Sequence, residues 1–510
     1  MLHINSLPDP VLERILARVF TPNETCLPSV CRKWHELAHT TCYVRFSESF
    51  CYDSDSDASS TNDETCVILD TNISNTTPTR CTRHILLTLL WPSNPVQFLE
   101  KALDILDTLY WPSVNTLSLS FVASCEDNDN DSDDKSVYPR MQSKTVWAAK
   151  EIARMLPGIS RLNIRANTSD SLSESFVLQL AAIYGQQLQQ LKCNMPLELS
   201  SLRFSANLQH LDLQLDPRMA DALQVHAEAL RTVSLSNVPV DFSLCRLIGQ
   251  ANKEISFDKL ESLHLAYAGQ RSKSTCSVVE PCTLRFPRLA NLSIQNCPKD
   301  CRVLDSKLPQ PMTNISLHGS FADIQKTNIS QIAVHTLSVT ITHMNHASMS
   351  EFYETSNRIF SNPEIFQAKL QLPRSRLDLE PSKIAWTNIT HLAMGDAVEF
   401  SNFLLLITAL PRAVKLDIAE ITLQNHPYEI LNETDDSIKP FKSRIEDLRM
   451  YINTEMYPTP LPAIEYVVLR IHSLRRVRLS KDAVLPARVI AKLLEPNYPH
   501  LVELVIDNAY

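Results

Sequence analysis

The stretches FPRLANLSI (residues 286–294) and YPHLVELVI (498–506) decide the fold, because they align position by position. Both read aromatic, Pro, x, Leu, x, x, Leu, x, Ile, and FDKLESLHL (257–265) and SANLQHLDL (205–213) repeat the same spacing of Leu. Successive side chains of a β-strand point to opposite faces. Each copy therefore predicts a short strand with one apolar and one polar face.

The copies recur along the chain at a nearly regular period. Their first apolar positions fall at residues 188, 208, 230, 260, 289, 312 and 334, which are 20 to 30 residues apart. Helices are predicted at 94–109, from Asp216 to about Leu230, at 396–410 and at 487–495, and Asp396 is expected to cap the third. Strands and helices alternating at this period form a parallel sheet that lines a solenoid, with the helices outside.

Residues 84–510 resemble the irregular leucine-rich repeats of the cytoplasmic, Cys-containing type. The resemblance implies an α/β fold, a leucine-rich-repeat solenoid (horseshoe) with parallel strands on its concave face. It also implies an inward-turning Asn or Cys three residues after the last apolar position of each strand. That position is held here by Asn167, Cys297 and Asn453, but also by Val238, Ala268 and Ile421.

The polar positions between the apolar ones are expected to face the concave surface. They are Arg161, Asn163, Arg165, Lys192, His210, Asp212, Ser262, His264, Asn291, Ser293, Asn314, His318, Asp447, Arg449, Tyr451, Arg476, Arg478 and Glu503. The candidate substrate face is C-terminal, because Arg449, Arg476 and Arg478 fall on adjacent predicted strands near Tyr451. Arginines beside an aromatic residue can hold a phosphate or a carboxylate. The alternative is a solvated polar face with local ion pairs to Asp447 and Glu503.

The N-terminal segment carries a different pattern, of two amphipathic helices. Asp9-Pro10 and Thr21-Pro22 are helix starts, because Pro is favoured at the first helical position. Apolar stripes at helical spacing follow both starts. The Leu-Pro pair at 7–8 and the Val-Cys-Arg-Lys-Trp run at 30–34 resemble an F-box, over about residues 5 to 46. Without that resemblance, two helices burying their stripes against each other or under the first repeat would account for the pattern.

The F-box resemblance implies a partner. F-boxes dock on the Skp adaptor of the Skp–cullin–F-box ubiquitin ligase. The candidates for that docking, or for the core of the box itself, are Leu7, Pro8, Leu12, Ile15, Leu16, Leu27, Val30 and Trp34. The chain departs from the family at Glu24 and Thr25, where an Asp-Leu or Leu-Leu pair is common, and at Pro28 within a helix.

The predicted domains are the F-box at 1–48, an acidic and partly disordered linker at 49–83, and the solenoid at 84–510. The linker contains the acidic run DSDSDASSTNDE (53–64), and EDNDNDSDDK marks a disordered acidic insertion near 124–137. Runs of like charge with almost nothing apolar to bury do not fold. We interpret them as solubilising loops, and the functional alternative is a docking segment tuned by phosphorylation.

Composition argues against several classes of function. The net charge of −9 disfavours nucleic-acid binding, and the presence of only 6 Gly disfavours Gly-rich phosphate loops. The start has no signal-peptide pattern, and the most apolar runs, at 85–91 and 403–410, are too short to cross a bilayer. The 13 Cys lack close pairing and fit reduced thiols, so we expect the cytoplasm or the nucleus.

No cofactor, metal or catalytic site is expected. The sequence holds no P-loop, nucleophile elbow or zinc-protease motif, and the spacing of Cys276, Cys282, Cys297 and Cys301 fits no compact zinc site. We therefore predict a non-catalytic substrate-recognition subunit of the ligase. Its F-box would bind the Skp adaptor and through it the cullin, and its repeats an unknown protein substrate, with no nucleic-acid or membrane partner. A non-degradative F-box scaffold and a GTPase-regulating repeat protein are the alternatives.

Overall fold

The structure is a computed structural model in which the chain forms two compact units. The residues it describes are 43–50, 65–71, 84–91, 103–104, 106–107, 111, 114–123, 138–166, 171–195, 206–215, 226–238, 255–268, 284–296, 308–325, 327, 329, 332–344, 348–373, 379–422, 441–452, 467, 471–480 and 503–507. Unit 1 comprises Met1–Leu260 and Gln270–Thr283, and unit 2 comprises Glu261–Gly269 and Leu284–Tyr510. Each unit is an α/β structure built on a long sheet.

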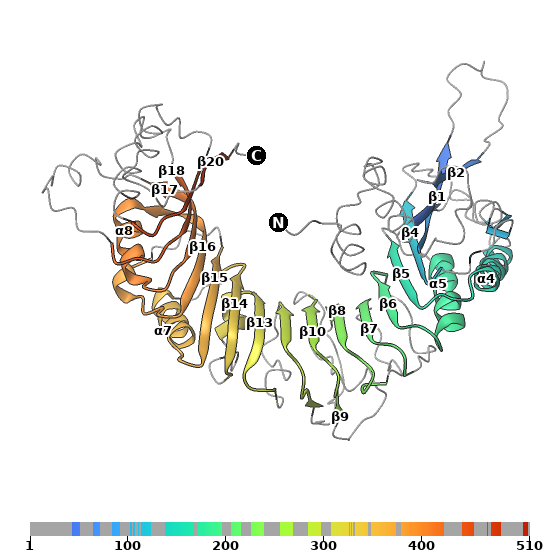
Figure 1. Cartoon of the computed structure of the whole chain (residues 1–510), viewed down its shortest axis with the longest axis horizontal. Helices are drawn as coiled ribbons and strands as arrows, with labels where there is room; N and C mark the ends of the chain where they lie inside the picture. Colours follow the sequence, from blue (N-terminus) through green and yellow to red (C-terminus); the bar gives the residue numbers. More distant parts are fainter. Residues whose placement is uncertain are drawn as a thin grey trace, which may run out of the picture. The chain divides into compact units, whose positions relative to one another are not determined.

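Unit 1 contains a mainly parallel sheet. Its strands are β1 (Tyr43–Phe50), β2 (Thr65–Thr71), β3 (His84–Trp91), β4 (Thr116–Ala123), β5 (Arg161–Ala166), β6 (Gln190–Cys193), β7 (His210–Gln214) and β8 (Thr232–Val238), and β9 (Ile255–Ser256) follows them. They pair in the order β2, β1, β3 and on to β8; β1 and β2 are antiparallel and the other pairs parallel. Helices α4 (Tyr138–Met155) and α5 (Ser171–Tyr184) lie together on one side of this sheet (Figure 1).

Unit 2 repeats the arrangement with more strands. They are β10 (Ser262–Tyr267), β11 (Leu284–Arg285), β12 (Asn291–Gln295), β13 (Met312–Gly319), β14 (Val334–Ile341), β15 (Ile365–Leu372), β16 (Ile389–Glu399), β17 (Lys415–Thr422), β18 (Asp447–Ile452), β19 (Arg476–Ser480) and β20 (Glu503–Asp507). Apart from β11, each is parallel to the next in chain order. The helices are α6 (Phe321–Gln325), α7 (Met349–Phe360), the 3-10 helix η7 (Pro381–Lys383) and α8 (Phe400–Ala409).

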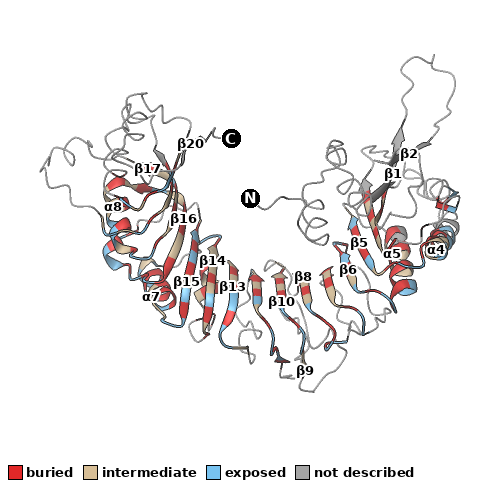
Figure 2. Ribbon diagram, in the orientation of Figure 1, coloured by how far each residue is buried: buried red, intermediate tan, exposed pale blue. Residues whose placement is uncertain are grey.

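The strands form where apolar and polar residues alternate, as the repeats predict. In β7, Leu211 and Leu213 are buried while Asp212 between them is only partly covered. The register sets apolar positions side by side, so that Leu211 is the partner of Leu191 in β6. Figure 2 shows this alternation of buried and more exposed residues along the strands. The predicted α/β class and its long, repeat-like parallel sheet are confirmed.

Several predictions fall outside the described residues. Among them are both predicted F-box helices, the eight adaptor-binding candidates from Leu7 to Trp34, the acidic insertion and the helix predicted at 487–495. Strands β1 and β2 lie where the sequence predicts the end of the F-box and the linker. Because Val44 of β1 is the partner of Ile85 in β3, the sheet of unit 1 includes residues before 84.

The helix predicted at 396–410 begins four residues late. Asp396 to Glu399 continue strand β16, and α8 starts at Phe400. Val398 is buried and pairs with β17, so extending the strand satisfies backbone groups and covers an apolar side chain. Asp396 is therefore not a cap, and the N-cap Glu399 makes no capping bond through its side chain.

The prediction of a helix from Asp216 to Leu230 is wrong at its C-terminal end, the only part of this range that the structure describes. Residues 226–230 form a turn, in which the amide of Ala229 donates to the carbonyl of His226 at 3.1 Å. Within the helix predicted at 94–109, residues 103–104 and 106–107 are helical, and Leu103 and Leu106 are buried.

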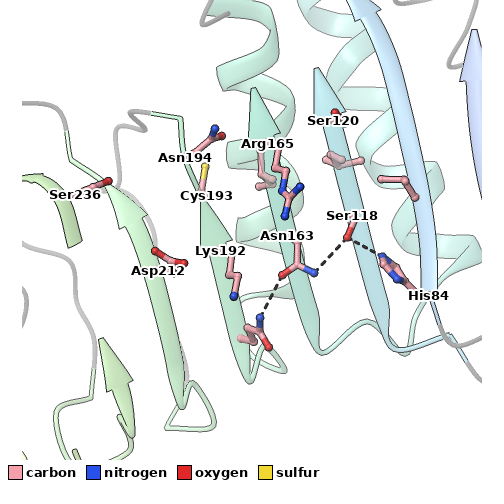
Figure 3. Close-up of a pocket in the computed structure, with 14 residues that line it drawn as sticks. His84, Ser118, Ser120, Asn163, Arg165, Lys192, Cys193, Asn194, Asp212 and Ser236 are labelled. Atoms are coloured by element: carbon pink, nitrogen blue, oxygen red, sulfur yellow. Dashed lines mark hydrogen bonds between the residues drawn. The ribbon is translucent and has the colours of Figure 1, made fainter. Parts of the chain in front are cut away.

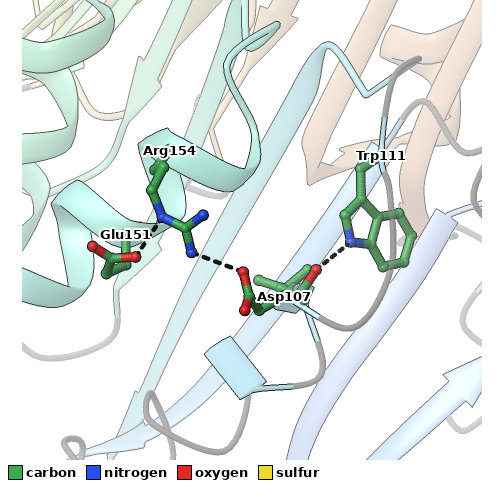
Figure 4. A network of polar contacts seen from close by, with 5 residues as sticks. Asp107, Trp111, Glu151 and Arg154 are labelled. Atoms are coloured by element: carbon green, nitrogen blue, oxygen red, sulfur yellow. Dashed lines mark hydrogen bonds and ion pairs between the residues drawn. The ribbon is translucent and has the colours of Figure 1, made fainter.

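A polar network joins the segment around Trp111 to α4 (Figure 4). Arg154 donates from Nη2 to Oδ1 of Asp107 at 2.8 Å and from Nε to Oε2 of Glu151 at 2.7 Å. The indole N–H of Trp111 donates to the carbonyl of Leu106 at 3.0 Å, and both side chains are buried. Exposed ion pairs contribute little to stability, so the buried Trp111 and Leu106 hold the segment in place.

An aromatic cluster forms the core beneath the strands of unit 2. The ring of Trp386 is fully buried and meets Phe352 and Phe360 edge-on, at centroid distances of 6.1 and 6.0 Å. Its indole N–H donates to Oγ of Ser356 at 3.1 Å, which satisfies a polar group that would otherwise be stranded in the core. The cluster thereby packs α7 against the segment that leads into β16.

Asparagine side chains tie the ends of neighbouring strands together. Asn194, Asn237 and Asn296 each donate from Nδ2 to a backbone carbonyl at the end of the preceding strand, at 3.3, 2.9 and 3.2 Å. Asn237 and Asn296 have φ of 55° and 52°, a left-handed conformation that Asn tolerates better than most residues. The sequence does not single out Asn296 for this role. The predicted Cys297 lies outside the described residues, and Val238 at the corresponding position of β8 is buried.

Candidate functional site

The polar face of unit 1 is arranged in rows that cross the strands. The middle row runs from Ser118 through Asn163 and Lys192 to Asp212, each residue being the Cα partner of the next. The neighbouring row includes Ser120 and its partner Arg165. Because the buried residues of these strands occupy the alternate positions, the rows lie on the face away from the core. The predicted polar positions from Arg161 to Asp212 are confirmed on this face.

These rows line a groove with a volume of about 740 Å³. The name "groove" is used below for the pocket bordered by His84, Ser118, Asn163, Arg165, Lys192 and Asp212 (Figure 3). Strands β3 to β7 supply these residues, one or two from each. Their spacing is therefore set by the backbone hydrogen bonds of the sheet and not by a loop.

Hydrogen bonds order one side of the groove. Nε2 of Gln190 donates to Oδ1 of Asn163 at 3.3 Å, and Nδ2 of Asn163 donates to Oγ of Ser118 at 3.2 Å. Oγ of Ser118 also lies 2.8 Å from Nε2 of His84, in a hydrogen bond whose direction depends on the tautomer. Four residues from four strands are thus held in defined orientations (Figure 3).

Burial lowers the pKa of His84 below its ordinary value of 6.5. Desolvation disfavours the charged imidazolium, so the ring is neutral at pH 7. A neutral imidazole has one donor and one acceptor nitrogen, which suits a hydrogen bond to a serine hydroxyl. His84 therefore orders the groove without adding charge to it.

Two cations reach the groove from adjacent strands. Arg165 in β5 and Lys192 in β6 are both exposed, and neither forms a hydrogen bond or ion pair with any residue that the structure describes. Asp212 is the only acidic side chain among the described residues that line the groove. The groove therefore carries a net positive charge, with two cations against one carboxylate.

Cys193 follows Lys192 in β6 and is also among the residues that line the groove. Its side chain is buried, and burial raises the pKa of the thiol to about 12, with a smaller contribution from Asp212. A thiol with that pKa is protonated at pH 7 and is a poor nucleophile. Sγ donates instead to the carbonyl of Met195 at 3.5 Å, in a structural role.

The arginines of the predicted C-terminal substrate face lie on neighbouring strands of unit 2. Arg449 of β18 is the Cα partner of Arg478 in β19, and Arg476 is the partner of Asp447. Nη1 of Arg449 lies 3.8 Å from Oδ2 of Asp417, a long ion pair. Three arginines on adjacent strands are therefore brought together, as the sequence predicts.

Other details of this face differ from the prediction or lie outside the description. Tyr451 belongs to β18, but its side chain is not among those described, and neither is that of Glu503. The ion pair described for Arg449 is made with Asp417, one strand away, which sequence reasoning did not select. Nε of Arg478 is buried without a hydrogen-bond partner among the described residues.

Sequence reasoning missed His84, Ser118 and Gln190, although all three contribute to the ordered side of the groove. Ser118 could have been found, because TLSLS (116–120) alternates in the same way as the better repeats. His84 and Gln190 sit at strand starts, where the pattern specifies no residue type. Their role depends on neighbouring strands and has no signal within a single strand.

The described residues hold no group of three or more His, Cys, Asp or Glu side chains that could bind a metal ion. The four cysteines weighed for zinc all lie outside those residues. Nor does any helix within the described ranges combine the length and apolar character needed to cross a membrane.

No protein-family model matches the chain, and a search of curated proteins finds no match.

Proposed function

We propose that this chain is the substrate-recognition subunit of a Skp–cullin–F-box ubiquitin ligase. The observation that carries the proposal is the polar face of the parallel sheet, where charged and amide side chains stand in register over an apolar core. In this proposal the sheets are built from leucine-rich repeats, and the face receives the protein to be ubiquitinated. The F-box resemblance of the N-terminal segment supplies the link to the ligase.

Such a face suits binding better than catalysis. The groove is ordered by neutral hydrogen bonds, and the buried thiol that lines it is protonated and is therefore a poor nucleophile. A recognition subunit needs no reactive nucleophile. It accelerates ubiquitin transfer by holding a substrate near the ligase at high effective concentration.

The adaptor contact is assigned to the N-terminal segment. Leu7, Pro8 and Trp34 are the proposed anchors, because a desolvated Trp beside aliphatic residues is typical of energetically dominant interface positions. The cullin is reached through the adaptor, and the cytoplasm or nucleus is the proposed location. No cofactor takes part.

Co-purification with the Skp adaptor tests this function. We expect the wild-type chain to retain the adaptor, and a Leu7→Ala, Pro8→Ala, Trp34→Ala variant to lose it with a decrease in affinity of at least about tenfold. The matched control replaces three exposed apolar residues of the units, Trp147→Ala, Ile183→Ala and Leu405→Ala, which are 46%, 40% and 53% exposed. This control should bind normally, and far-UV circular dichroism should show both variants folded.

Two results would contradict the proposal. If the wild-type chain does not retain the adaptor, the N-terminal helices only cover the first repeat. If the N-terminal variant binds as well as the control, the adaptor is held by a different surface.

A further inference from the structure

We propose that the groove of unit 1 is an anion-recognition site for a phosphoryl group on an extended segment of the bound protein. This deepens the proposed function, on which it rests only in taking the ligand to be part of a protein substrate. It assigns the recognition of a charged modification to unit 1, and not to the C-terminal arginines that the sequence favours.

The first argument is the pair of unneutralised cations. Arg165 and Lys192 lie on adjacent strands, and Lys192 is the Cα partner of Asn163, two residues before Arg165. Strand spacing and rise therefore put their Cα atoms roughly 8 Å apart. Both side chains can reach one ligand between them. Neither has an ion-pair partner within the described part of the chain.

The second argument is the set of neutral donors around the cations. Ser120 is the Cα partner of Arg165 and presents a hydroxyl to the groove. The amide of Asn163 is held by its hydrogen bonds to Ser118 and Gln190, so its side chain is already ordered before a ligand binds. A phosphoryl group offers three acceptor oxygens and nearly two negative charges. Two cations with several oriented donors match that ligand better than a single carboxylate.

The third argument is the position of Asp212. It follows Lys192 in the middle row and so lies on the far side of that lysine from Arg165. A ligand anion between Arg165 and Lys192 is therefore separated from the carboxylate by a cation. The negative charge of Asp212 still opposes the binding of an anion. Removing that charge should therefore increase the affinity, and the direction of this change tests the site.

The experiment measures peptide binding to the full-length chain by fluorescence anisotropy. The probes are three labelled nonapeptide pools that share degenerate flanks and differ only at the central residue, which is phosphoserine, serine or glutamate. We expect the phosphoserine pool to bind at least about tenfold more tightly than the serine pool, because charge-assisted hydrogen bonds are the strong ones. The glutamate pool separates a carboxylate ligand from a phosphoryl ligand, and inorganic phosphate should compete with the phosphoserine pool.

Matched variants locate the site. Arg165→Gln and Lys192→Gln should each weaken phosphoserine binding by about fivefold to tenfold. Two control variants remove the same charge elsewhere: Arg161→Gln, in the same strand but outside the groove, and Lys150→Gln on α4. Both should leave the affinity for the phosphoserine pool within about twofold of wild type. Asp212→Asn should strengthen binding by about twofold to threefold.

Equal binding of the three pools, or an equal loss in Arg165→Gln and Arg161→Gln, would overturn the inference. A loss confined to Arg449→Gln would move anion recognition to the C-terminal arginines and would overturn it as well. Tighter binding of the glutamate pool would replace the phosphoryl ligand by a carboxylate. Since this assay contains no adaptor, a failure of adaptor binding leaves its result intact, and the two proposals fail separately.

Discussion

At the scale of single residues, Trp386 shows how one side chain satisfies packing and polarity together. Its ring fills the space between Phe352 and Phe360, and its N–H is satisfied by Ser356. All of the ring is withdrawn from solvent. Removing either the ring volume or the hydrogen-bond partner therefore leaves a defect that the surrounding core cannot repair.

We expect Trp386→Phe to lower the free energy of unfolding by about 2 kcal/mol, through the lost hydrogen bond and the cavity left beside Phe352. The measurement is urea denaturation followed by far-UV circular dichroism. Trp147→Phe is the matched control, because Trp147 is 46% exposed on α4 and its change should stay within about 0.5 kcal/mol. Equal effects of the two variants would show that the aromatic cluster does not stabilise unit 2.

The alternation of polar and apolar residues predicted the direction of individual side chains well. Arg165, Lys192 and Asp212 were assigned to the polar face from their own strands alone. The contacts that side chains make across the strands could not be predicted in that way. Asn163 bonds to Ser118, which is 45 positions earlier in the chain, and that contact depends on the register between repeats. A single strand carries no information about its register with another.

At the scale of elements, the ends of the strands were harder to predict than their middles. Asp396 to Glu399 look like a helix start, yet they extend β16 because β17 offers backbone partners there. Competition between a local cap and a distant strand is decided by tertiary contacts. The bond from Asn296 to the carbonyl of Tyr267 has the same origin, because it depends on the neighbouring strand β10.

Two substitutions separate the roles of Asn296. Asn296→Ala should cost about 2 kcal/mol of unfolding free energy, because Ala loses the hydrogen bond and is strained at a φ of 52°. Asn296→Gly should cost only about 1 kcal/mol, because Gly adopts that φ freely. Urea denaturation measures both, with Thr313→Ala on the exposed side of β13 as the neutral control. A Gly variant as unstable as the Ala variant would show that the left-handed backbone adds nothing.

At the scale of the whole molecule, two histidines make stability depend on pH. Burial lowers the pKa of His84, and burial together with Lys369 and Lys415 lowers the pKa of His391, with Asp447 opposing. The unfolded chain, with an ordinary histidine pKa of 6.5, therefore binds protons more readily than the folded chain. Stability is fully present above that pH and is lost as the pH falls towards the lowered values.

We expect the urea concentration at the unfolding midpoint to decrease as the pH is lowered from about 7.5 to about 5.5. Each histidine should change the free energy of unfolding by at most about 1.4 kcal/mol per pH unit. His84→Gln and His391→Gln should each flatten this dependence, whereas His226→Gln in a turn of unit 1 serves as the control. A slope unchanged in both variants would assign the pH dependence to other groups. The general fold class was predictable from the period of the repeats, but this property was not, because it arises from burial within the assembled sheet.

The parallel register of unit 1 has a consequence for how a linear ligand is read. Neighbouring strands are spaced about 4.8 Å apart, whereas an extended peptide advances about 3.4 Å per residue. From β3 to β8 there are five interstrand steps, or about 24 Å, which equals roughly seven peptide residues. The residues of a peptide lying along a row would therefore fall out of register with the strands and would come back into register only at the far end of the row. The two periods give every strand a different alignment with the peptide segment proposed above, so that each position along a row would contact a different part of that peptide.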